Sequence, residues 1–462
     1  MMQWNRLYNN TRTGKKKSVN STTGLNRNSF QRDYDRIIFS SAFRRLQNKT
    51  QVFPLPGTVF VHNRLTHSLE VASVGRSLAS SIGQRIAGKY AEEPEGFRDF
   101  YKYEFSSVIG AACLAHDIGN PPFGHSGEDA IRYFFENLPA YEKGIFESKL
   151  STNQQLDFLK FEGNANAIRT LTHAFGENEP GGYKLTYATL ASIVKYPTDS
   201  TSGFNKSSLH TKKSGFFDSD INVWKDIADT LGIPKLNEDK NIYARHPFVY
   251  IVEAADDICY RIIDLEDAHR LGIISLEGIT ELYMDMFDGQ HRYFNISNIK
   301  EQYERINDDN NKIQYLRAML IGLLVENISN VFMNNEEALL QGKLNDSLLD
   351  LLPAHQLKAI KQIDDWSVKY LYNHTSIVEI EVAGYKVIGE LLKTFTGVIF
   401  HESNPLNKKL LKLIPAQFII DYNEQSFYEN LMSIVDYITS MTDLYAVDLY
   451  KKINGMNLIT NV

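Results

Sequence analysis

Apolar residues recur along this chain at intervals of three and four, which is the spacing of one helix face. The segment 35–47 shows the pattern clearly, with Ile38, Ala42 and Leu46 one turn apart. The same periodicity predicts helices over 65–86, 105–118, 165–175, 185–195, 248–268, 315–333 and 427–453. The sequence therefore predicts an all-α fold.

Strict alternation of apolar and polar residues, the sign of a strand, is rare. One short β-hairpin is expected from residues 50–53 and 59–62, around the turn residues Pro54–Gly57. The polar stretches 198–220 and 235–243 are predicted to be long loops. No linker rich in Pro, Gly and Ser divides the chain, so at most this small hairpin interrupts a continuous helical body.

Composition fits a soluble protein with a large core. Hydrophobic residues make up 43% of the 462 positions, with 25 Tyr and 26 Phe. No run of about eighteen apolar residues is present, and the polar, basic start lacks the apolar segment of a secretion signal. Cys113 and Cys259 are the two cysteines, and both lie in apolar stretches. Because two such residues make no disulfide framework, we expect a cytoplasmic protein.

Charge is distributed unevenly. Residues 1–50 hold eleven Lys and Arg against Asp33 and Asp35, a net charge of +9. Because the whole chain carries −7, the remaining residues carry a net charge of −16. A basic arm on an acidic body is typical of a protein that meets a polyanion, either nucleotide phosphates or a nucleic acid strand. An ordinary solvated surface explains the same pattern equally well.

The first candidate for chemistry is the pair His116-Asp117. It follows an apolar helix and comes just before Gly119-Asn120-Pro121-Pro122, which ends that helix. The carboxyl end of a helix favours a cation, and imidazole with carboxylate is a ligand set for a divalent metal. Because 12 His in a chain of this length give such a dipeptide by chance, the pair needs support from other residues.

Further residues supply that support. Arg64 and His67 share a helix face, where Arg64 could bind a phosphate beside a His ligand. Asp256, Tyr260 and Asp264 form one stripe flanked by Ala and Ile, so we expect the stripe to face inward. An inward carboxylate is costly unless it is paired or binds a metal.

His125 and Glu128 are three residues apart, just beyond the His-Asp pair. This spacing suits a proton donor and a carboxylate that orients it.

Taken together, these residues resemble the HD superfamily. The closest resemblance is to its deoxynucleoside triphosphate triphosphohydrolases, in particular those acting on deoxyguanosine triphosphate. Matching segments extend from near the N-terminus to about residue 445, with Ser440 in place of the usual Gly. The matching segments are 43–53, 63–68, 119–125, 161–165, 195–196 and 436–443. The resemblance implies one large α-helical HD domain over 1–462, with a core of about 60–270 and a C-terminal helical part of about 271–462 packed on it.

The resemblance also implies roles for individual positions. Metal ligands would be His67, His116, Asp117 and Asp256. The catalytic pair would be His125 and Glu128. Gln51 and Asp264 would hold the sugar 3′-hydroxyl, with Tyr260 packed on the deoxyribose. Groups around the phosphates would be Arg64, Asn164, Lys195, Tyr196 and Lys213.

The implied reaction is metal-dependent hydrolysis at the α-phosphorus, which yields a deoxynucleoside and inorganic triphosphate. Mg or Mn is the expected metal, with Fe as a third choice, because a mixed set of two His and two Asp accepts several divalent ions. The resemblance further implies a homo-oligomer, a hexamer or tetramer, and a nucleotide or single-stranded DNA effector. Two alternatives stay open: an HD phosphohydrolase for another nucleotide, and a nucleotide or single-strand sensor with a silent site.

Overall fold

The computed structural model describes the chain except residues 15–27, 54–60, 176–179, 419, 424 and 457–462. Helices dominate the described residues, and their one sheet pairs β1 (Lys235–Asn237) with β2 (Ile242–Tyr243) in antiparallel fashion. The prediction of an all-α fold with at most a small hairpin is therefore confirmed. The hairpin itself lies inside a segment predicted to be a loop, because its three- and two-residue strands are too short to alternate recognisably.

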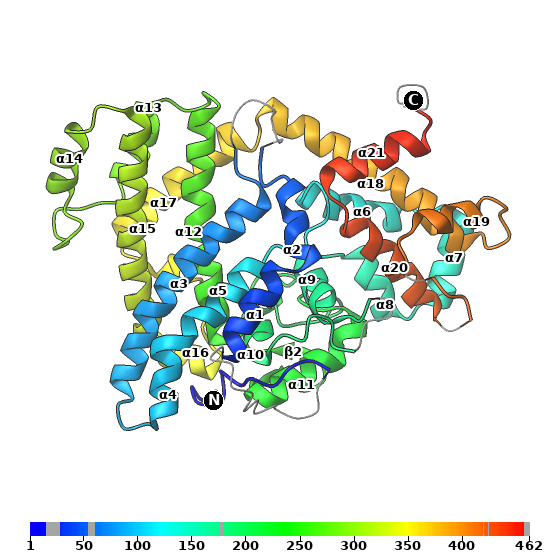
Figure 1. Cartoon of the computed structure of the whole chain (residues 1–462), viewed down its shortest axis with the longest axis horizontal. Coiled ribbons are helices and arrows are strands. Elements are labelled where there is room, and N and C mark those ends of the chain that lie inside the picture. Colours follow the sequence, from blue (N-terminus) through cyan, green and yellow to red (C-terminus); the bar gives the residue numbers. More distant parts are fainter. Residues whose placement is uncertain (15–27, 54–60, 176–179, 419, 424, 457–462) are drawn as a thin grey trace.

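Three helices form the centre of the larger core. The helix α3 (Arg64–Lys89) begins with a capping box between Asn63 and Thr66. It packs along α5 (Phe105–Ala115), and α12 (Pro247–Arg270) packs against both (Figure 1). Gly75 on α3 allows this close approach, since a Cβ there would lie 2.5 Å from Cys113 Sγ on α5 and 3.5 Å from the Ala255 Cβ on α12. Gly83 likewise faces the Tyr101 carbonyl oxygen, just before α5, at 2.1 Å from where its Cβ would be.

Other helices surround this centre. Those before α12 are α1 (Ser29–Ile38), α2 (Ser41–Arg45), α4 (Glu95–Asp99), α6 (His125–Glu136), α7 (Ala140–Lys149), α8 (Thr152–Leu159), α9 (Gly163–Thr172), α10 (Tyr187–Ala191) and α11 (Ile221–Leu231). Those after it are α13 (Leu276–Met284), α14 (Ile296–Glu304), α15 (Asp309–Asn334), α16 (Glu336–Gln341), α17 (Ala354–Trp366), α18 (Thr375–Phe400), α19 (Asn407–Leu410), α20 (Phe427–Thr439) and α21 (Asp443–Ile453). Short 3-10 or π turns cover 46–48, 100–104, 209–211, 218–220, 349–351, 367–371 and 411–413.

A second hydrophobic core lies between α6, α18 and α20, on the right of Figure 1. The helix α18 connects the two cores, because Ile377 near its start packs in the first and Ile388 and Leu392 pack in the second. The start of α18 also lines the cavity described below, together with Arg64 at the start of α3.

Two predicted helices are broken in the structure. The segment 35–47 divides at Ser40, whose hydroxyl accepts a hydrogen bond from the Phe43 amide and so starts α2. The segment 427–453 divides into α20 and α21, because the Thr442 side chain caps a new helix at Asp443. The predicted hairpin at 50–62 lies partly outside the described residues, and an isolated antiparallel bridge joins Thr50 to Asn63 at its base.

One helix, α15, is long and apolar enough to cross a bilayer by composition alone. It packs instead against α3, α12 and α13 and buries Leu316, Leu320 and Leu323 in the larger core. Core helices commonly have this composition, so the composition of α15 alone is weak evidence of a membrane span.

The basic N-terminal segment is used largely inside the molecule. Arg12 pairs with the buried Asp33 at 2.5 Å, and Arg36 donates to the Lys184 carbonyl. Arg6 donates to backbone carbonyls at the end of α11, and Lys49 is buried. Among the described residues, much of the excess positive charge is therefore structural and not available to a polyanion.

Candidate functional site

A cavity of about 580 Å³ opens where α3, α5, α6, α12 and α18 meet. Nearly all of the site residues predicted from sequence line it. These are Gln51, Arg64, His116, Asp117, His125, Glu128, Asn164, Lys195, Tyr196, Lys213, Asp256, Tyr260 and Asp264. His67 is the exception, and it lies directly behind the cavity wall, against Asp256.

Three candidate ligands converge from three helices. His67 on α3, His116 at the end of α5 and Asp256 on α12 present ligand atoms that all lie within 4.8 Å of one another. The Asp256 Oδ1 atom is 3.1 Å from His67 Nε2 and 3.5 Å from His116 Nε2. These residues are separated by 189 positions at most, yet two imidazoles and a carboxylate face one point, as divalent metal sites require.

The ring of His116 is oriented as that of a ligand would be. Its Nδ1 atom is 2.6 Å from the Cys113 carbonyl oxygen, which fixes the ring and leaves Nε2 for a ligand. The Nε2 atom is buried without a hydrogen-bond partner. Such an atom is costly unless a cation or donor occupies the space before it. Among the described residues, these three side chains therefore fit a divalent metal ion.

Electrostatics agree with a cation at this point. Burial alone would lower the pKa of His116, but Asp117 and Asp256 together raise it to about 9. Burial would likewise raise the pKa of Asp256, and His116 and Lys195 hold it well below its usual range. The carboxylates thus create a negative potential that a divalent cation would satisfy.

Asp117 has a different environment from the other three candidates. Its Oδ2 atom accepts a hydrogen bond from Arg64 at 2.8 Å, and its Oδ1 atom accepts one from the Asn120 amide at 2.6 Å. The Oδ1 atom is 3.6 Å from His116 Nε2, but Asp117 is not in the group of three described above. As a fourth ligand it would have to share one of these oxygens with the metal.

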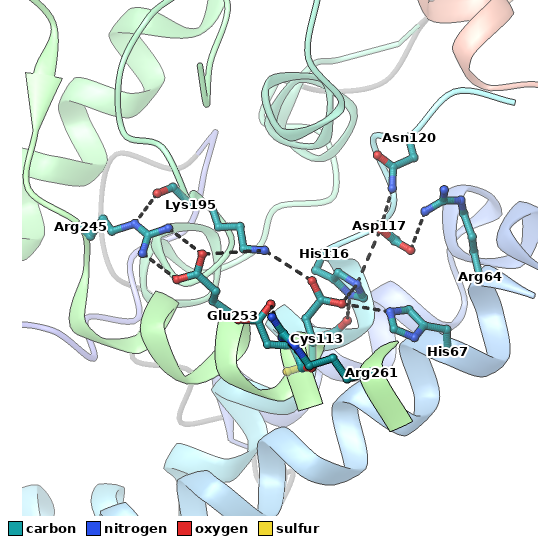
Figure 2. A network of polar contacts seen from close by, with 12 residues as sticks. Arg64, His67, Cys113, His116, Asp117, Asn120, Lys195, Arg245, Glu253 and Arg261 are labelled. Atoms are coloured by element: carbon teal, nitrogen blue, oxygen red, sulfur yellow. Dashed lines mark hydrogen bonds and ion pairs between the residues drawn. The ribbon is translucent and has the colours of Figure 1, made fainter. Parts of the chain in front are cut away.

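Cationic side chains line the same cavity. Lys195 lies 3.4 Å from Asp256 and 3.9 Å from Glu253, and Glu253 also binds Arg245 through two hydrogen bonds of 2.7 and 3.0 Å (Figure 2). Lys213 donates to Glu162 at 2.9 Å. Each lysine therefore pairs with a carboxylate at the cavity edge and can offer further donors to an anion.

The candidate catalytic pair is only partly as predicted. His125 begins α6 and lines the cavity, and burial together with the charges of Lys213 and Arg64 lowers its pKa. Glu128 does not orient it in this conformation: its Oε1 atom accepts the Gly163 amide at 2.7 Å, and within the described residues it has no hydrogen bond to His125. The i, i+3 spacing suggested a direct contact, but the buried Gly163 amide competes for the carboxylate.

The far end of the cavity holds the residues expected around a sugar. Gln51, Tyr260 and Asp264 all line it, and the buried Gln51 Oε1 atom has no hydrogen-bond partner. Burial raises the pKa of Asp264 to about 8, although a hydrogen bond from the Tyr372 hydroxyl at 3.1 Å opposes the shift. At neutral pH Asp264 is therefore mainly protonated and can donate as well as accept a hydrogen bond.

Sequence reasoning missed four residues of this site. Asn120 binds Asp117, Glu162 binds Lys213, Tyr372 binds Asp264, and Glu381 lines the cavity from α18. Asn120 and Glu162 lie in the segments 119–125 and 161–165, which the family resemblance had already marked, so both could have been assigned to the site from the sequence. Tyr372 and Glu381 come from a region more than 100 positions beyond Asp264, and no local signal marks them.

Comparison with known proteins gives two family matches. Residues 64–203 match the HD domain, and residues 351–452 match the phosphohydrolase-associated domain. Whole-chain relatives are similar to this protein along almost their entire length. A deoxyguanosinetriphosphate triphosphohydrolase-like protein of Synechocystis sp. is 36% identical over 99% of this chain and 100% of its own. One of Listeria monocytogenes is 34% identical over 99% and 100%, and a deoxyguanosinetriphosphate triphosphohydrolase of Serratia proteamaculans is 31% identical over 92% and 93%.

Proposed function

Because this chain belongs to the family of HD-domain deoxyguanosinetriphosphate triphosphohydrolase-like proteins, we propose that it hydrolyses a deoxynucleoside triphosphate, preferably dGTP, at the α-phosphorus. The products are the deoxynucleoside and inorganic triphosphate. The convergence of His67, His116 and Asp256 beside a cavity lined by lysines carries the proposal. A divalent cation and several positive side chains are what a substrate with about four negative charges requires.

The residues of the cavity have separate roles in the proposed reaction. His67, His116 and Asp256, with Asp117 as a fourth, would hold the metal, which supplies Lewis-acid polarisation of a phosphoryl oxygen. His125 in its neutral form accepts a proton from the attacking water, or in its protonated form donates one to the 5′-oxygen of the leaving deoxynucleoside as the bond between that oxygen and the α-phosphorus breaks. Its lowered pKa keeps the base form available at neutral pH.

Positive side chains hold the triphosphate. Lys195, Lys213 and Arg64 each bind a carboxylate of the protein in the free enzyme. When a triphosphate enters, these groups turn their remaining donors toward its oxygens and offset the negative charge on them while water attacks the α-phosphorus and the deoxynucleoside leaves.

The sugar end of the cavity favours a deoxyribose. Gln51 and the protonated Asp264 offer an acceptor and a donor to the 3′-hydroxyl, and the Tyr260 ring packs on the sugar face. A 2′-hydroxyl would meet this ring and be crowded. The free Gln51 Oε1 atom supports the assignment, because a substrate hydroxyl would satisfy it.

The base would lie near the start of α18. Ile377 and Ile380 provide apolar contacts there, and the Glu381 carboxylate lies at the same wall. Guanine presents a ring N–H and an amino group on one edge, and one carboxylate can accept from both. Adenine lacks that pair of donors, so Glu381 supports a preference for dGTP.

A product assay tests the proposal. The purified protein is incubated with each of the four deoxynucleoside triphosphates and with Mg²⁺, Mn²⁺ or Fe²⁺, and the products are separated by chromatography. We expect deoxyguanosine and inorganic triphosphate in equal amounts. Release of pyrophosphate or of a monophosphate would instead identify another kind of nucleotide hydrolase.

A matched pair of His variants tests the metal ligands. His116→Ala should lose bound metal and turnover together, because the Nε2 atom facing Asp256 is gone. His401→Ala, which removes an exposed ring paired with Glu142, should keep both. Metal content by elemental analysis separates this outcome from a loss of turnover alone.

The same family membership leads us to propose a cytoplasmic homo-oligomer, a tetramer or hexamer, with a nucleotide or single-stranded DNA as effector. Light scattering on the purified chain measures the oligomeric state, and a monomer would contradict the proposed homo-oligomer. A salt-dependent gain in turnover on adding single-stranded DNA would identify DNA as an effector. A sensor without catalysis has less support, because its main argument was the basic arm and most of the described part of that arm is bound internally.

A further inference from the structure

A second cavity lies behind the candidate active site and shares no lining residue with it. Its volume is about 250 Å³, and it is enclosed by the ends of α2, α9 and α20. Ile118 contributes to its wall, directly after the His116-Asp117 pair. The loop that carries Asp117 and Asn120 therefore separates two cavities, one on each side.

Cationic groups without carboxylate partners face this second cavity. Arg45 at the end of α2 lines it, and within the described residues its guanidinium has no ion pair. Lys49 also lines it, is 2% exposed, and uses two of its three donors on the carbonyl oxygens of Asn120 (2.5 Å) and Thr439 (2.8 Å). Burial lowers the pKa of both side chains, that of Lys49 to about 7 although Asp443 opposes the shift, so a bound anion would favour their charged forms.

A buried acceptor completes the set. Asn166 on α9 is 2% exposed and lines the same cavity, and its Oδ1 atom has no hydrogen-bond partner. Its amide nitrogen is committed to the Gly119 carbonyl at 2.7 Å, so the orientation of the side chain is fixed. The one carboxylate on this wall, Asp436, is already neutralised by two-pronged hydrogen bonds from Arg169.

The rest of the wall is aromatic. The rings that line the cavity are His173, Phe175, Tyr183 and Phe418. His173 and Phe175 meet edge to face at 4.8 Å, and burial lowers the pKa of His173 to about 4, so its ring is neutral. A flat or apolar group could lie on these rings while an anionic group reached the cations.

We propose that this second cavity is a binding site for a phosphate group that carries a hydrogen-bond donor. The anionic oxygens contact Arg45 and the free donor of Lys49, and a protonated phosphate oxygen donates to Asn166 Oδ1. The cavity is larger than a phosphate ion, so a phosphorylated small molecule with a ring also fits. Because Lys49 and Asn166 hold the carbonyls of Asn120 and Gly119, a ligand here contacts the loop of the active site from behind.

Calorimetry with inorganic phosphate on the full chain tests the site. Two arginines on one helix give a matched comparison: Arg45→Gln removes the cation of the second cavity, whereas Arg44→Gln removes an exposed one that lies over Phe39. A third variant, Lys213→Gln, weakens anion binding in the first cavity. We expect the wild type to bind phosphate at two sites. Arg45→Gln should weaken binding at one of them at least tenfold, whereas Arg44→Gln and Lys213→Gln should leave the affinity of that site unchanged. Equal phosphate binding by the wild type and Arg45→Gln would overturn the proposal.

Two further titrations define the ligand. Sulfate carries no proton at pH 6, where Lys49 is charged, so it cannot donate to Asn166 and should bind the Arg45-dependent site at least fivefold more weakly than phosphate. Equal binding of the two ions would contradict the role of Asn166. A 5′-deoxynucleoside monophosphate, titrated at pH 6 where about half of its phosphate groups carry a proton, distinguishes the source. Arg45-dependent binding tighter than that of free phosphate at the same pH supports a ring on the aromatic wall, and equal binding supports free phosphate. None of these measurements depends on hydrolysis, so their failure would leave the proposed enzyme activity untouched.

Discussion

His125 illustrates how neighbouring charges set the chemistry of a single side chain. Burial lowers its pKa first, and Lys213 and Arg64 lower it further, while Glu162 and Asp117 oppose them. If neutral His125 accepts the proton, turnover should be lost on acidification only below pH 6.5, the ordinary pKa of His. His125→Ala should leave metal and substrate bound but unreacted, and full turnover in that variant would contradict the assigned role.

The contribution of Lys213 to this pKa can be measured. Lys213→Gln removes the cation that acts most strongly on His125 after burial, so the pKa of His125 should rise. The acid limb of the profile of kcat against pH should then move to higher pH, while KM increases because a phosphate contact is lost. Lys212→Gln, at the neighbouring position outside the cavity, is the control and should leave the acid limb in place.

Asp264 gives a pH dependence of stability. Its pKa is about 8 in the folded chain and near 3.8 when unfolded, so the folded state binds the extra proton between these values. Stability is therefore fully present below about pH 4 and is lost as the pH rises toward 8. Asp264→Asn cannot ionise and should raise the melting temperature progressively from pH 5 to pH 9. Asp365→Asn, an exposed position on α17, is the control; a gain independent of pH in Asp264→Asn would show that ionisation is not the cause.

At the scale of elements, α3 depends on small residues where it meets its neighbours. A Cβ at Gly83 would lie 2.1 Å from the Tyr101 carbonyl oxygen, whereas a Cβ at Gly88 on the same helix would meet nothing within 4 Å. Gly83→Ala should therefore destabilise the fold by about 1–3 kcal/mol through overpacking. Gly88→Ala should stabilise it by up to about 1 kcal/mol, because alanine favours helix. Urea denaturation of both variants measures the difference, and a stabilising Gly83→Ala would refute the close packing.

The sequence predicted elements well where periodicity was long and poorly where a cap decided the boundary. The helices α3 and α12 agree with their predicted ranges within a few residues, because their apolar faces extend over many turns. Ser40 and Thr442 each begin a new helix inside a periodic segment, and one capping hydroxyl does not change the hydrophobic pattern. Tyr372 and Glu381 could not be assigned to the site from the sequence either, because they reach the cavity only when α18 and the residues before it pack beside it.

At the scale of the whole molecule, the candidate active site depends on the C-terminal helices. Asp443 at the start of α21 accepts hydrogen bonds from the Thr50 and Phe123 amides, on two sides of the cavity mouth. The cavity walls are thus formed by residues that range from position 50 to position 381. This supports the expectation of one large domain, with an HD core and a C-terminal part that packs on it, and makes cooperative unfolding its direct test.

The buried ion pair between Arg169 on α9 and Asp436 on α20 connects these two parts. Both side chains are 3% exposed, and the shortest of their hydrogen bonds is 2.7 Å. Asp436→Ala leaves a buried guanidinium without its partner, which should cost about 3–5 kcal/mol. If the two parts form one domain, this loss should shift a single melting transition in circular dichroism.

An exposed ion pair at the end of α14 provides the control. Glu301→Ala breaks an exposed pair with Arg305 on α14 and should cost less than about 1 kcal/mol, because water screens that pair. The double variant Arg169→Met with Asp436→Leu removes both buried charges and should recover much of the lost stability, since the cost lies in the unpaired charge and not in the absent bond. Two separate transitions, of which Asp436→Ala lowers only one, would mean instead that the C-terminal helices fold as a unit of their own and only dock against the HD core.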